Sequence, residues 1–134
     1  MAEDQKTEDR YRQLQMIQQQ AEQIAEYVQK LQMQLQEIDN SLEALQELKN
    51  TAINTEILAP VANGIFLKAS LQDNQKLVVN VGAEVTVEKT IPEVINLLQE
   101  QKEKITQNVS EAEGVLQELQ EHVRRVYQEM GEAQ

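Results

Sequence analysis

Side chains with catalytic or metal-binding chemistry are scarce in this sequence. It has one histidine, His122, and no cysteine, so it offers neither a Cys–His pair nor a cluster of nitrogen and sulfur metal ligands. Its four glycines are scattered and form no phosphate-binding loop. The glutamates fall mainly on outward positions of predicted helices. We therefore expect no enzymatic activity, no cofactor and no bound metal.

The dominant pattern in the first third of the chain is a row of apolar residues at alternating spacings of three and four. Its members are Leu14, Ile17, Ala21, Ile24, Val28, Leu31, Leu35, Ile38, Leu42 and Leu45. A narrow stripe of this length is typical of a left-handed coiled coil rather than of a globular helix. No glycine or proline interrupts it, so we predict one helix over residues 5–50.

The C-terminal third repeats the pattern and predicts a second helix over residues 91–130. The row consists of Ile95, Leu98, Lys102, Ile105, Val109, Ala112, Leu116, Leu119, Val123, Val126 and Met130. Thr90 and Glu93 have the spacing of a capping box at the start of this helix, and Gly131 is a candidate for its end.

The two rows match when the helices run antiparallel. In the matching register Leu14 faces Val126, Leu45 faces Ile95, and every layer pairs an a position with a d position. Lys102 then faces Ile38 as the one polar member, and its stem is expected to pack while its ammonium group reaches water. We predict that the helices fold into one antiparallel coiled coil.

Between the helices, over residues 55–89, apolar residues alternate with a period of two. Turn signals at Asn63-Gly64, Asp73-Asn74 and Gly82-Ala83 separate four short strands, which form two consecutive β-hairpins with Pro60 at a strand end or on a sheet edge. Four short strands cannot close a core of their own, so we expect strands of several subunits to pair into a common barrel. The residues expected in that interface are Ile65, Phe66, Leu67, Leu77, Val79, Val81, Val85 and Val87. The predicted class is α+β.

Composition narrows the possible partners and the compartment. The 134 residues predict a single domain, and the net charge of −11 argues against nucleic acid and an anionic membrane surface as partners. No segment is long and apolar enough to span a bilayer, and the N-terminus lacks a secretory signal pattern. The absence of cysteine fits a reducing compartment, and we expect the chain to be cytoplasmic.

The central segment resembles the alpha-class subunit of archaeal prefoldin, and the similarity extends over essentially the whole chain. The matching stretches are residues 56–60 (EILAP), 64–69 (GIFLKA), 77–83 (LVVNVGA) and 87–89 (VEK). The two-hairpin insert fits the alpha class, since beta-class subunits carry one hairpin. The resemblance implies a hexamer of two alpha and four beta subunits. It also implies an ATP-independent holdase, whose coiled-coil tips bind unfolded proteins and deliver them to a group II chaperonin.

In this chain the tips are the two chain ends, roughly residues 1–20 and 120–134. Apolar residues there are the candidates for client binding: Tyr11, Leu14, Met16, Ile17, Val123, Val126, Tyr127 and Met130. Leu14, Ile17, Val123 and Val126 also belong to the seam, so ordinary core packing is the stronger explanation for these four residues. The other four also fit incidental surface exposure. The alternative to a holdase is a structural coiled-coil scaffold that binds no client.

Overall fold

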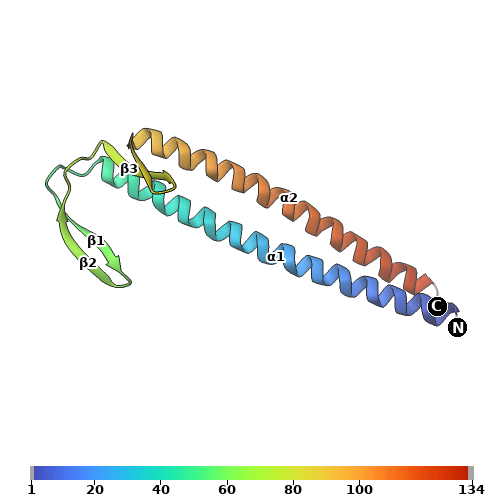
Figure 1. The fold of residues 1–134 in the computed structure, drawn as a ribbon. Coiled ribbons are helices and arrows are strands. Elements are labelled where there is room, and N and C mark those ends of the chain that lie inside the picture. Colours follow the sequence, from blue (N-terminus) through green and yellow to red (C-terminus); the bar gives the residue numbers. More distant parts are fainter. Residues whose placement is uncertain (1, 133–134) are drawn as a thin grey trace. The chain divides into compact units, whose positions relative to one another are not determined.

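The computed structural model describes residues 2–132, and its elements follow the predicted order of helix, two hairpins and helix. They are α1 (Ala2–Lys49), β1 (Glu56–Ala62), β2 (Ile65–Ser70), β3 (Lys76–Gly82), β4 (Val85–Thr90) and α2 (Ile91–Glu132) (Figure 1). The predicted α+β class is confirmed. The residues form two compact units, one built from the helix segments up to 36 and from 103 onward, the other from residues 37–102.

The start of α2 follows the predicted capping box. The backbone N–H of Glu93 donates to Oγ1 of Thr90 at 3.3 Å, and the Thr90 hydroxyl donates to Oε1 of Glu93 at 3.1 Å. The prediction that Gly131 ends this helix is wrong, because α2 continues to Glu132. A glycine ends a helix when it adopts a left-handed conformation, and Gly131 is not among the glycines with positive φ.

In the first unit, α1 and α2 lie side by side in opposite directions (Figure 1). The predicted seam residues here are all buried or half-buried, and the most enclosed are Leu14, Ile17, Val28, Leu31, Ala112 and Val126. Two polar contacts cross the seam near the chain ends. Arg10 Nη1 donates to the backbone carbonyl of Glu129 at 3.1 Å, and a hydrogen bond of 3.2 Å joins the side chains of Gln13 and His122. Both contacts agree with the predicted antiparallel register.

In the second unit the seam continues through Ile38, which is buried, and through half-buried Leu42 and Leu45. Lys102 occupies an a position and is itself half-buried. Its Nζ lies 2.6 Å from Oδ1 of Asp39, so its charge is paired at the edge of the seam rather than placed within it.

Each hairpin is a separate two-stranded antiparallel sheet. In the first, Ile57 pairs with Ala69 and Pro60 with Phe66, and a bulge follows Pro60. The proline is tolerated because both strands of a two-stranded sheet are edges. In the second, Leu77 pairs with Lys89 and Val79 with Val87, and a bulge lies between Asn80 and Gly82. The turn of this hairpin is Ala83–Glu84, one residue later than the predicted Gly82-Ala83.

Backbone hydrogen bonds connect the hairpins to the neighbouring segments. The N–H of Leu71 donates to the carbonyl of Thr55 at 3.0 Å, and the N–H of Ile91 donates to the carbonyl of Gln75 at 2.9 Å. Leu71 and Ile91 are the buried apolar residues beside the strands, and Ile91 is only 1% exposed. At the start of β3, the backbone N–H groups of Gln75 and Lys76 donate to the Asp73 carboxylate, and these bonds hold the pKa of Asp73 below its usual value.

Candidate interaction surfaces

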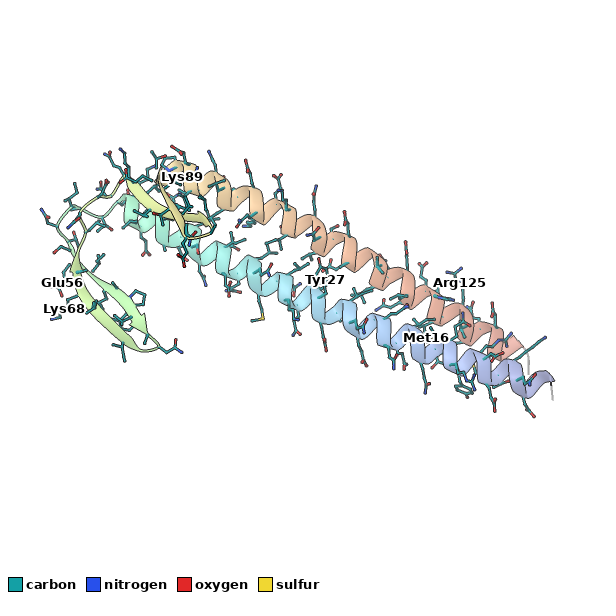
Figure 2. The ribbon with its side chains drawn as sticks, in the orientation of Figure 1. Met16, Tyr27, Glu56, Lys68, Lys89 and Arg125 are labelled. Atoms are coloured by element: carbon teal, nitrogen blue, oxygen red, sulfur yellow. The ribbon has the colours of Figure 1, made fainter. Side chains whose placement is uncertain are left out.

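Three of the predicted tip residues form exposed apolar surface near the chain ends. Tyr11 and Met16 on α1 are 57% and 61% exposed, and Tyr127 on α2 is 56% exposed. All three lie at heptad positions other than a and d, which explains why the partner helix does not cover them. Met130 is half-buried beside the Arg10 contact. Figure 2 labels Met16 and, on α2, Arg125.

The other four predicted tip residues belong to the seam. Leu14, Ile17 and Val126 are 3–5% exposed, and Val123 is half-buried. In this paired state their side chains contact the opposite helix rather than solvent. The surface that the tip offers to another molecule therefore consists mainly of the two tyrosines and Met16.

The hairpins expose most of the residues predicted to form an interface. Ile65, Phe66, Leu67, Val81 and Val85 are more than half exposed, whereas Leu77 and Val79 are half-buried and Val87 lies between at 36%. Neighbouring residues of one strand point to opposite faces, so the exposure of Ile65, Phe66 and Leu67 leaves both faces of the first sheet apolar. Continuous apolar surface of this kind is typical of an interaction site.

Sequence reasoning missed several exposed apolar residues. On the strands these are Leu58, Val61 and Val78, and on the helices they include Tyr27, Met33 and Val115. The strand residues belong to the same alternating runs and could have been found from them. The helix residues lie outside the seam, where a single apolar residue is common, so the pattern did not distinguish them.

The described residues were compared with the patterns of a metal site and of a membrane-spanning helix. Residues 2–132 contain no group of three or more His, Cys, Asp or Glu side chains that could hold a metal ion. No described helix is long and apolar enough to cross a membrane. The exposed apolar surfaces of the tip and the hairpins are the main candidates for an interaction site.

Known proteins match this chain along nearly its whole length. The family model of the prefoldin subunit matches residues 7–134. The prefoldin alpha subunit of Methanococcoides burtonii is 32% identical, with 86% of this chain and 83% of that protein aligned. The alpha subunit of Pyrococcus horikoshii is 30% identical, covering 90% and 82%.

A solved structure shows the same fold. It is the filamentous PFD of Methanocaldococcus jannaschii, seen by cryo-electron microscopy, which is 19% identical with a TM-score of 0.79 over 89% of this chain and 98% of that chain. The family match, the alpha-subunit relatives and the two hairpins between paired helices agree, and the chain belongs to the prefoldin family of chaperones as an alpha-class subunit of the archaeal type.

Proposed function

We propose that this chain is a subunit of an ATP-independent holdase that binds unfolded proteins at its coiled-coil tips. The observation that carries the proposal is the exposure of Tyr11, Met16 and Tyr127 near the chain ends. Tyrosine is enriched at interfaces because it combines apolar area with a polar end, and methionine adapts to varied partners. Each tip offers little area, so useful affinity arises when several tips bind one client together.

The proposal includes assembly through the hairpins with beta-class subunits, in a hexamer of two alpha and four beta subunits with a shared barrel. The exposed apolar residues on both hairpins support this assembly, because no other part of residues 2–132 buries them and a neighbouring subunit would. In this proposal residues 1–134 work as one domain in the cytoplasm, and the client passes to a group II chaperonin.

The test is suppression of aggregation of a chemically unfolded client, followed by light scattering without ATP. The reconstituted complex carries either the unchanged chain or the variant Tyr11→Gln/Met16→Gln/Tyr127→Gln. Glutamine keeps helix propensity, so the coiled coil is expected to remain folded. We expect the variant complex to suppress aggregation less, because the apolar area at the alpha tips is lost.

The matched control is Met33→Gln, which removes an exposed methionine from the same helix outside the tip. Circular dichroism and light scattering of the complexes check that folding and assembly are unchanged. Equal suppression by the triple variant and the unchanged chain would contradict client binding at these alpha tips. Failure of the unchanged complex to suppress aggregation at all would favour the alternative, a structural scaffold.

A further inference from the structure

Two adjoining hollows lie on the first unit: one is between the helices, and the other is on α2 and extends toward the tip residues proposed above. The first has a volume of about 220 Å³ and is lined by Ile24, Tyr27, Asn108, Glu111, Ala112 and Val115. The second has a volume of about 290 Å³ and is lined by Val115, Glu118, Leu119, His122 and Arg125. Because the hollows share Val115, they form one continuous surface, here called the arm groove.

The groove has a simple origin in the sequence. Ala112, which lines the first hollow, occupies a d position that faces Val28 in the predicted register, and Leu119, which lines the second, faces the small Ala21 in that register. Small side chains leave the space between the helix backbones partly unfilled. Beside this gap Tyr27 and Val115 remain 48% and 43% exposed and form its apolar walls. Tyr27 is labelled on α1 in Figure 2.

The spacing of the hollows suits a helical ligand. On α2 the first hollow is lined by Ala112 and the second by Leu119, and these residues are seven positions apart, which corresponds to about 10 Å along the helix. A ligand helix repeats its apolar face at the same interval, so residues at i and i+7 can enter the two hollows together. Extended chain places side chains of one face at intervals of about 7 Å and matches this distance poorly.

The charged residues that line the arm groove indicate which kind of ligand helix it would bind. Glu111 lines the first hollow and Glu118 the second, also seven positions apart, while Arg125 is the one arginine or lysine lining the second hollow. The whole chain carries a net charge of −11, so a second copy of it is repelled and a basic segment is attracted. Charge and spacing together favour a basic amphipathic helix.

We propose that the arm groove is a second client site, which binds basic amphipathic helical segments of non-native proteins. This inference rests on the proposed holdase function and adds a substrate class to it. Apolar side chains of the client enter the two hollows, and its Lys or Arg residues lie against Glu111 and Glu118. At the end of the arm groove that is nearer the tip, the Gln13–His122 hydrogen bond crosses the seam beside the second hollow.

The test measures binding of labelled peptides to the reconstituted complex by fluorescence anisotropy. Two helical peptides share the same leucines at heptad spacing and differ only in carrying Lys or Glu on the flanks. We expect the Lys peptide to bind about tenfold more tightly, and Tyr27→Gln/Val115→Gln to remove most of that difference. The matched control Met33→Gln, on the outer face of α1, is expected to change nothing. Equal affinities, or no effect of the double variant, would overturn the proposal.

Photo-cross-linking then locates the client. Benzoylphenylalanine is placed in separate complexes at Val115, at Met33 and at Met16, and an unfolded client is added. We expect client cross-links from positions 115 and 16 and none from 33. Cross-links from 16 alone overturn the groove site and leave the holdase proposal standing, whereas cross-links from neither position contradict both. A cross-link from 115 to another subunit shows that the groove is an assembly surface and also overturns the proposal.

Discussion

At the scale of single residues, the turn between β3 and β4 holds two non-glycine residues in the left-handed region. Ala83 has φ of 50° and Glu84 has φ of 62°, as in the hairpin turns that favour Asn-Gly. A side chain with a Cβ is strained there, whereas glycine is not. We expect Glu84→Gly to stabilise the complex by about 1 kcal/mol, measured by thermal unfolding. Glu88→Gly, within β4, is the contrasting variant, and a lower midpoint for Glu84→Gly would contradict the strain argument.

Lys102 places a charged group at a seam position that is otherwise apolar. Its Nζ is paired with Asp39 at 2.6 Å, but the two side chains are 44% and 54% exposed, so the pair contributes at most about 1 kcal/mol. A leucine at this position would add apolar contact with Ile38. We expect Lys102→Leu to raise the thermal midpoint and Asp39→Ala to lower it only slightly. A marked drop in the thermal midpoint with Lys102→Leu would show that the lysine itself stabilises the coiled coil.

At the scale of elements, the register of the two helices is the feature most open to a direct test. Gln13 and His122 lie opposite each other across the seam, with their side-chain nitrogens 3.2 Å apart. We expect the pair Gln13→Cys/His122→Cys to be joined efficiently by a short bismaleimide, detected by a shift in gel mobility. The mismatched pair Gln13→Cys/Val115→Cys is the control. Equal cross-linking of both cysteine pairs would mean that the two helices are not held in one register.

At the scale of the whole molecule, the exposed faces of the hairpins predict that this subunit depends on partners. Ile65 and Val85 are 60% and 54% exposed. A lysine at such a position would be desolvated without a partner in an assembled barrel. We expect Ile65→Lys/Val85→Lys to prevent formation of the complex with beta-class subunits, measured by size-exclusion chromatography with light scattering. The control Tyr27→Lys, on α1, is expected to assemble normally. Normal assembly of the double variant would contradict the proposed role of these faces.

Most of the fold follows from the sequence because its periodicities are strong. A seam with spacings of three and four predicts α1 and α2, and alternation around Asn63-Gly64 predicts the first hairpin. The antiparallel register also follows, because the alignment that pairs Leu14 with Val126 matches the remaining layers of the two rows as well. The exact ends were less predictable: Gly131 stays helical, because glycine permits a left-handed end but does not require one.

The candidate surfaces, like the fold, were predictable from the sequence only in part. Tyr11, Met16 and Tyr127 lie outside the seam positions, so the heptad pattern by itself determined that they face away from the opposite helix. Only the tertiary structure decided that Leu14, Ile17 and Val126 are covered, since the same residues would be exposed in frayed helix ends. It also decided where the arm groove lies, because a hollow depends on how Ala112 and its neighbours pack across two helices. Periodicity describes one helix, whereas enclosed space arises only when two helices meet.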